Sequence, residues 1–115
     1  MIAPEEPALF AIVERGGEVL LSGEIDLAAK AELRSVLDAV LVRDGRLVVD
    51  LTAVSFIDSS GIEALCMARR RAERSGATVV LRSPTAIVMR ALEVTGVAPL
   101  FHIDGSAGDH PRFDQ

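Results

Sequence analysis

The sequence predicts a single α/β domain with a mixed, mostly parallel sheet. Apolar patterns alternate in the order strand, strand, helix, strand, helix, strand, helix, strand, which is typical of this fold class. Residues 46–51 form an almost continuous apolar run, as expected for a parallel strand covered by helices. The first two strands are joined by Gly16-Gly17, which indicates an antiparallel hairpin. A chain of 115 residues accommodates one such domain.

The N-terminal half supplies the hairpin and the first helix. Residues 1–7 form a lead-in with two prolines and two acidic side chains, and the domain is expected over residues 8–103. The first two strands are predicted at 8–13 and 18–23. Asp26 is a suitable N-cap for the first helix, which Asp44-Gly45 should end. Apolar residues at helical spacing mark its buried face: Leu33, Val36, Leu37, Val40 and Leu41.

The second helix should begin near Ser59 or Ser60, because Ser60 and Glu63 have capping-box spacing. Its inward face is expected to carry Leu65, Ala68 and Ala72, and Gly76 should stop it. Four arginines crowd its C-terminal half: Arg69, Arg70, Arg71 and Arg74. They are interpreted as a solvated helix end that complements the dipole, with a patch for an acidic partner as the alternative.

The C-terminal part continues with a strand at 78–81. A third helix is predicted with Ser83 as its cap, Pro84 at its first position and Gly96 at its end. Its apolar stripe should consist of Ile87, Val88, Ala91 and Leu92. A short last strand is expected at 100–103, followed by a polar, mobile tail at 104–115.

Composition narrows the possible functions. The formal net charge of -5 disfavours nucleic acid as a partner, because phosphate binding requires a basic surface. The single cysteine, Cys66, permits no internal disulfide and is interpreted as a core or near-core residue. The N-terminus does not resemble a signal peptide, and no apolar stretch is long enough for a membrane helix. A cytoplasmic protein without membrane insertion is therefore expected.

The central motif is Asp58-Ser59-Ser60-Gly61, between a predicted strand and a predicted helix. The first N–H groups of a helix have no intrahelical partners and carry partial positive charge. A serine hydroxyl at this turn is exposed and lies where a phosphate group is tolerated. The simpler interpretation is that one of the two serines caps the helix.

This motif, preceded by Val54-Ser55-Phe56-Ile57 and followed by Ile62, resembles the phosphorylation-site turn of the STAS domain family. Upstream, Gly23-Glu24-Ile25-Asp26 resembles the family's Gly-Glu-(Leu/Ile)-Asp motif. The resemblance covers roughly residues 8–103 and is closest to bacterial anti-sigma factor antagonists (anti-anti-sigma factors). It implies a small sheet with its helices largely on one face.

The resemblance also implies a function and a site. Such a protein binds an anti-sigma factor that is a serine kinase, releases a sigma factor, and is switched off by phosphorylation; a phosphatase reverses the switch. Ser59 corresponds to the phosphorylated residue and Ser60 is the secondary candidate. The expected partner-binding residues are Asp26, Asp58, Ser59, Ser60, Gly61 and Glu63. Asp26 and Asp58 have capping as their simpler interpretation. The family often has Gly-Leu-Gly where this chain has Gly61-Ile62-Glu63, so Glu63 departs from the family motif, and its carboxylate would repel a nearby phosphate. No cofactor, metal or catalytic residue is implied.

The sequence also has features of other classes of protein. A STAS subunit of another assembly, such as a lipid-transport ATPase complex or a signalling particle, is the main alternative. A phospho-receiver domain with Asp50 as acceptor is disfavoured for two reasons. A receiver opens with a strand and a helix, whereas this chain opens with two strands. A receiver also needs a lysine late in the chain, whereas the only lysine here is Lys30. A Ser59–His102–Asp triad is disfavoured because nothing near these residues supplies an oxyanion hole. A zinc site is disfavoured because the chain has only two distant histidines, His102 and His110, and one cysteine. No phosphate-binding loop or nucleophile-elbow motif is present.

Overall fold

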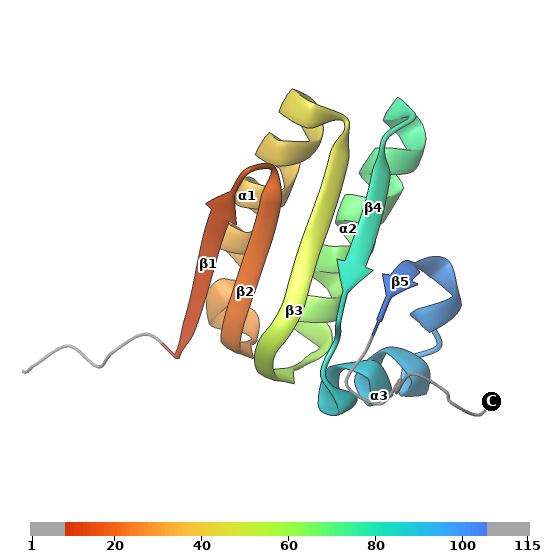
Figure 1. Cartoon of the computed structure of the whole chain (residues 1–115). Helices are drawn as coiled ribbons and strands as arrows, with labels where there is room; N and C mark the ends of the chain where they lie inside the picture. The colour runs from red at the N-terminus through yellow and green to blue at the C-terminus, as the bar shows by residue number, and fades with distance from the viewer. Residues whose placement is uncertain (1–8, 106–115) are drawn as a thin grey trace, which may run out of the picture.

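A computed structural model describes residues 9–105 and contains one five-stranded mixed sheet (Figure 1). The spatial order of the strands follows the chain, from β1 to β5. β1 is antiparallel to β2, and every other neighbouring pair is parallel. The predicted α/β class, the mixed sheet and the order of elements are confirmed. The strands are β1 (Phe10–Arg15), β2 (Glu18–Ile25), β3 (Arg46–Ile57), β4 (Thr78–Arg82) and β5 (His102–Asp104).

The opening hairpin turns at Gly16 and Gly17, as predicted. Both glycines have positive φ, 60° and 84°, a conformation that other residues adopt only with strain. β1 begins and ends two residues later than expected, and β2 continues through Ile25. The antiparallel pairing and the sheet order distinguish this fold from the doubly wound 2-1-3-4-5 order of receiver domains.

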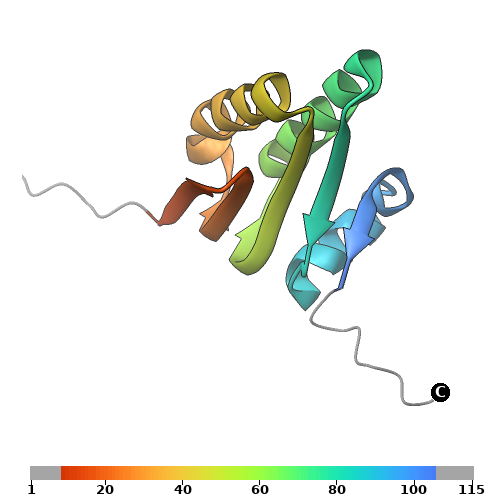
Figure 2. The ribbon, with the colours of Figure 1, turned by 45° about the horizontal axis from the view of Figure 1, so that its top comes forward.

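Helices α1 (Leu27–Asp44) and α2 (Ser59–Ser75) lie side by side on one face of the sheet (Figures 1 and 2). Asp26 caps α1 as predicted, and Gly45 ends it with a φ of 67°. Four of the five predicted core residues of α1 are buried, whereas Val36 is only half-buried. The predicted core residues of α2 are all buried, and Gly76 ends that helix with a φ of 75°.

β3 is longer than the sequence indicated, because it spans 12 residues and ends at Ile57. Asp50 therefore lies in mid-strand and not at a strand end. Its carboxylate accepts a hydrogen bond from the backbone N–H of Thr52 at 2.9 Å. The extension of β3 carries the chain directly into Asp58 at the start of α2.

The predicted start of the third helix is wrong. α3 (Ala86–Val94) is capped by Thr85, whose hydroxyl accepts a hydrogen bond from Val88 N and donates one to Val54 O at 2.9 Å. Ser83 instead has a φ of 51° and donates its backbone N–H to Asp104 O at 2.8 Å. Tertiary contacts with β3 and β5 thus move the start of the helix by two residues.

The last strand is also displaced. Leu100, expected in the strand, ends a short 3-10 helix, η1 (Ala98–Leu100), that contains Pro99. β5 is therefore His102–Asp104, and Asp104, expected in the tail, belongs to the sheet. The expected lead-in at 1–7 and the expected tail from residue 106 onward lie outside the described residues.

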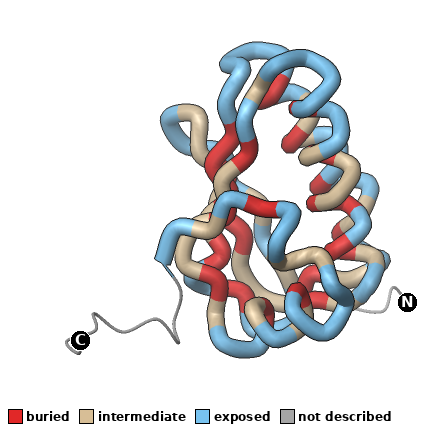
Figure 3. The backbone as a smooth tube through the Cα atoms, turned by 90° about the vertical axis from the view of Figure 1, so that its right-hand side faces the viewer, coloured by how far each residue is buried: buried red, intermediate tan, exposed pale blue. Residues whose placement is uncertain are grey.

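The core lies between the sheet and the helices, where the buried segments face one another (Figure 3). α3 contributes Val88 and Leu92, whereas Ile87, predicted on the same stripe, is 57% exposed. Cys66 is partly buried against this core, as expected, and burial raises the pKa of its thiol. None of the helices described combines the length and apolar character required to cross a bilayer.

Candidate functional site

The carboxyl ends of β2 and β3 meet at one edge of the sheet. Ile25 and Ile57 are register partners in this parallel pair. The N–H of Asp58 donates a hydrogen bond to the carbonyl of Ile25 at 3.1 Å. Asp26 and Asp58 each follow one of these strands, and each caps the next helix. The structure therefore brings together the two acidic motifs that are far apart in the sequence.

Asp58 is the N-cap of α2. One carboxylate oxygen, Oδ1, accepts hydrogen bonds from the N–H groups of Ser60 at 2.8 Å and Gly61 at 3.2 Å. The predicted capping role of Ser60 is therefore wrong, and so is the capping box with Glu63. Ser59 is the first residue of α2 and Ser60 the second. Within residues 9–105, neither serine hydroxyl takes part in a side-chain hydrogen bond.

The two serines differ in accessibility. Ser59 is exposed, whereas Ser60 is half-buried. The Ser59 hydroxyl stands at the positive end of a 17-residue helix. Because Asp58 already satisfies the N–H groups of Ser60 and Gly61, a phosphate on Ser59 would share this terminus with a carboxylate.

Gly61 allows α2 to start close to the sheet. A Cβ atom at this position would lie 2.8 Å from the carbonyl oxygen of Ile25 and 2.7 Å from Cγ1 of Ile57. Real Cβ atoms do not approach other atoms so closely. Gly61 is buried, so its role visible in the structure is close packing of the turn that carries Ser59.

Glu63 forms an ion pair with Lys30 of α1. The hydrogen bond from Lys30 lowers the pKa of the Glu63 carboxyl, and the charges of Lys30, Arg34 and Arg70 lower it further. The negative charge that a phosphate on Ser59 would meet is therefore partly matched by cations. Lys30 was missed as a site residue, although its position four residues after Asp26 places it in the first turns of α1.

The described residues do not assemble the alternative chemistries. His102 pairs with Val80 on β4, and β4 separates β5 from β3, so the structure does not bring His102 to Ser59. His110 lies outside the described residues. Over residues 9–105 no three His, Cys, Asp or Glu side chains gather in an arrangement suited to a metal ion.

Comparison with known proteins identifies the family. The model of the STAS domain matches residues 11–110, which is most of the chain. The chain belongs to the STAS domain family. The STAS resemblance predicted from the two motifs is confirmed.

Named relatives of this STAS domain include anti-sigma factor antagonists. The chain is 26% identical over 93 residues to the anti-sigma-B factor antagonist of Listeria monocytogenes, a match that covers 80% of this chain and 82% of that protein. It is also 37% identical over 59 residues to a probable sulfate transporter 3.4 of Arabidopsis thaliana, which covers 51% of this chain and 9% of the transporter.

Solved structures show the same fold. An anti-sigma factor antagonist from Mycobacterium paratuberculosis has a TM-score of 0.63 at 27% identity, covering 83% of both chains. Unphosphorylated SpoIIAA, an anti-sigma factor antagonist, has a TM-score of 0.66 at 20% identity, covering 82% of this chain and 86% of the other. The phosphorylated form of SpoIIAA from Bacillus matches with a TM-score of 0.60 at 19% identity, over 82% of this chain and 89% of that one.

Proposed function

We propose that this STAS domain is an anti-sigma factor antagonist. It binds an anti-sigma factor that is also a serine kinase, and thereby releases a sigma factor for transcription. The observation that carries this proposal is the exposed Ser59 hydroxyl at the first position of α2, left free because Asp58 caps the helix. The similarity to anti-sigma factor antagonists, one of which is known in a phosphorylated form, supports it.

Phosphorylation of Ser59 would end the binding through charge. A phosphoserine adds about -1.5 to -2 charges at neutral pH. In the free domain the positive end of α2 offsets part of this charge. Against a partner surface the same group must lose its water, and like-charge juxtaposition across an interface costs several kcal/mol. A phosphatase acting on phosphorylated Ser59 would restore binding.

The residues around Ser59 would form the partner-binding surface. Asp26 and Asp58 fix the ends of β2 and β3 and place the turn. Ser60 and Gly61 shape the first turn of α2, and Glu63 presents a carboxylate one turn further on. In this proposal the domain supplies a surface and a phosphate acceptor and carries out no catalysis of its own, in the cytoplasm and without a cofactor.

A kinase assay tests the phosphate acceptor. The purified domain is incubated with ATP and an anti-sigma factor kinase encoded in the same genome, and the label is located by phosphopeptide mapping. Ser59→Ala should abolish labelling, and the matched Ser60→Ala variant should retain it. Label on Ser60 with Ser59 unmodified would show that the acceptor is one residue further on. Phosphate incorporation by the domain alone would contradict a purely binding role.

A STAS subunit of another assembly is the second candidate, and the similarity to the sulfate transporter favours it. The lipid-transport ATPase complex and the signalling particle belong to the same alternative. Neighbouring genes distinguish the candidates: an anti-sigma kinase or sigma factor gene supports the antagonist, and transporter genes support the subunit.

A further inference from the structure

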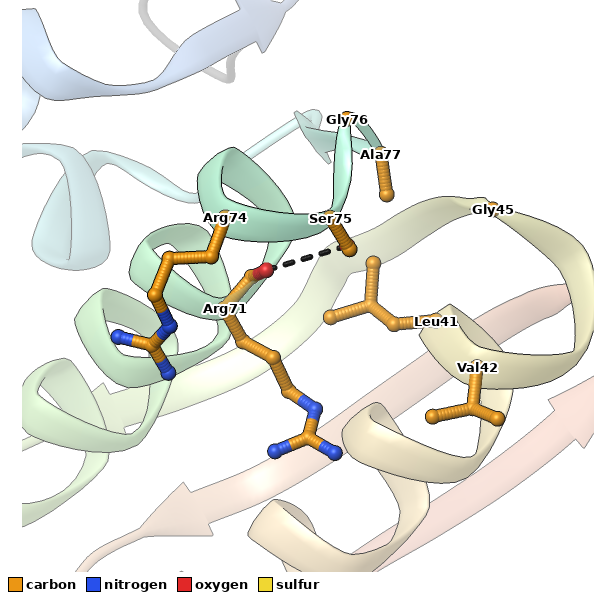
Figure 4. Close-up of a pocket in the computed structure, with 8 residues that line it drawn as sticks. All are labelled: Leu41, Val42, Gly45, Arg71, Arg74, Ser75, Gly76 and Ala77. Carbon is orange, nitrogen blue, oxygen red and sulfur yellow. Dashed lines mark hydrogen bonds between the residues drawn. The ribbon is translucent and has the colours of Figure 1, made fainter.

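A groove runs between α1 and α2 and continues to their C-terminal ends, where the proposed function does not use it. It consists of two adjoining cavities that share Arg71 and Arg74. The larger cavity, of about 500 Å³, is also lined by Leu41, Val42 and Ala77 (Figure 4). The smaller, of about 100 Å³, adds Arg34 and Asp38. We call these seven residues the α1–α2 groove.

One side of the α1–α2 groove is apolar and open to solvent. Val42 is 73% exposed, although it is a large aliphatic side chain. Leu41 beside it is buried, and Ala77 is half-buried at the far side of the cavity. The combination offers a place where a partner's apolar side chain could bury Val42.

The other side of the groove is basic. The smaller cavity is lined by three arginines, Arg34, Arg71 and Arg74, and by a single acidic residue, Asp38, so its local net charge is +2. The whole chain has a net charge of -5, so this local balance opposes the overall charge. Arg71 approaches Asp38 only at 3.7 Å, and Arg74 has no ion-pair partner within 4.0 Å in residues 9–105.

Two carbonyls near the end of α2 are satisfied without these arginines. The hydroxyl of Ser75 donates to the carbonyl of Arg71 at 3.2 Å, as drawn in Figure 4, and to that of Ala72 at 3.3 Å. The N–H of Ala77 also donates to Ala72 O at 2.8 Å. The carbonyls of Arg71 and Ala72 are therefore satisfied without a guanidinium group, and neither Arg71 nor Arg74 donates a hydrogen bond to a backbone carbonyl within residues 9–105.

We propose that the α1–α2 groove binds an acidic segment of a protein partner. A carboxylate of the segment pairs with Arg71 and Arg74, and a neighbouring apolar side chain covers Val42. Arginine matches carboxylates bidentately and is enriched among the residues that dominate interface affinity. A free phosphate would use the arginines and leave Val42 exposed. The Arg71–Arg74 end of the groove is separate from the Ser59 turn, since Arg74 lies 15 residues further along α2, roughly 22 Å at 1.5 Å per residue.

A defined peptide tests the proposal independently of the anti-sigma factor. The probe is a short fluorescein-labelled peptide rich in Glu and Leu, with Glu→Gln and Leu→Ser versions as controls. Affinity is measured by fluorescence anisotropy, and the site by NMR amide shifts. Charge reversal at Arg71→Glu and Arg74→Glu together should weaken binding by about 100-fold or more, because like charges then face each other. Val42→Ser should weaken it by about tenfold through lost apolar burial.

Matched variants distinguish peptide binding in the groove from nonspecific electrostatic attraction and from an effect of Ser59. Arg15→Glu with Arg90→Glu changes the net charge equally, at exposed positions outside the groove, and should leave the affinity within about twofold of wild type. Ser59→Asp should also leave peptide binding unchanged, whatever its effect on an anti-sigma factor. If circular dichroism shows that the variant with both Arg71→Glu and Arg74→Glu does not fold, the peptide affinities of Arg74→Gln and Val42→Ser test the proposal instead.

Several results would overturn the proposal. One is an affinity that survives the reversal of both groove arginines, and another is a set of shifted amides that surrounds Ser59. Displacement of the peptide by equimolar inorganic phosphate would make the groove an anion site. Comparable, arginine-dependent binding to phosphatidylglycerol vesicles, with none to the peptide, would make it a lipid-binding surface.

Discussion

Lys30 of α1 forms an ion pair with Glu63 of α2, one turn after Ser59. This pair ties the two helices together beside the phosphate acceptor. It also answers the concern that the Glu63 carboxylate would repel a phosphate, because its charge is matched by an ammonium group. The pair is exposed at Glu63, so its contribution to stability is expected to be small.

Lys30→Met should raise the pKa of Glu63 toward its ordinary value, because the hydrogen bond that lowers it is lost. A carboxyl whose pKa is lowered by folding stabilises the protein at neutral pH, and this contribution disappears as the pH falls through the lowered pKa. The stability difference between wild type and Lys30→Met should therefore be present at pH 7 and vanish in acid. NMR titration measures the pKa of Glu63, and urea unfolding at pH 7 and in acid measures the stability difference. Lys30→Arg is the control, and a Glu63 pKa unchanged in Lys30→Met would contradict the pairing.

Asp58→Ala should destabilise the domain by about 0.5–2 kcal/mol, the usual cost of losing an N-cap. The reason is that Ser60 N and Gly61 N lose their acceptor at the start of α2. Asp58→Asn should retain most of the stability, since its side-chain carbonyl can accept the same bonds. Urea unfolding measures the free energies. Ser60→Ala is the matched control; a loss as large as that of Asp58→Ala would mean that Ser60, not Asp58, is the cap.

Gly61→Ala should destabilise the domain by about 1–3 kcal/mol through overpacking. Helix propensity alone would favour alanine by about 1 kcal/mol, so the sign of the change is diagnostic. The added Cβ would press against the carbonyl of Ile25 and the side chain of Ile57. Gly45→Ala provides the comparison. An added Cβ at Gly45 meets no atom within 4 Å, so a loss of stability there comes from the positive φ of 67° and not from overpacking. A stabilised Gly61→Ala variant in thermal unfolding would show that α2 does not pack this closely.

Ser59→Asp should keep the circular dichroism spectrum of the wild type. A carboxylate in the first turn gains typically ~0.3–1 kcal/mol from the helix dipole, while the neighbouring Asp58 opposes it. Binding to an anti-sigma factor should nevertheless fall by about 100-fold or more, because a charge is placed in the interface. Ser59→Ala should bind and resist inactivation by the kinase. Calorimetric titration measures both, and equal affinity of Ser59→Asp and wild type would refute the charge mechanism.

Most of the architecture could be predicted from the order of residues along the chain. Strand and helix periodicities predicted the order of elements, and the glycines at 16, 17, 45 and 76 marked turns and helix ends correctly. These features depend on local backbone preferences and on which face of an element is apolar. Two short motifs also indicated the STAS family, which the family model confirms. The assignment of Ser59 as phosphate acceptor remains a prediction.

The roles of individual side chains at the site depend on contacts between elements that are distant in the sequence. Ser60 and Asp58 were both plausible caps locally, but the hydrogen bond from Asp58 N to Ile25 O fixes Asp58 just before α2, where its carboxylate reaches the free N–H groups. In the same way, hydrogen bonds to β5 and β3 place Ser83 before the helix and Thr85 at its cap. Neither the Lys30–Glu63 pair nor the α1–α2 groove is visible in a linear pattern, because each forms between helices whose residues are about 30 positions apart. Such contacts depend on how the helices pack, which the spacing of residues along one helix does not specify.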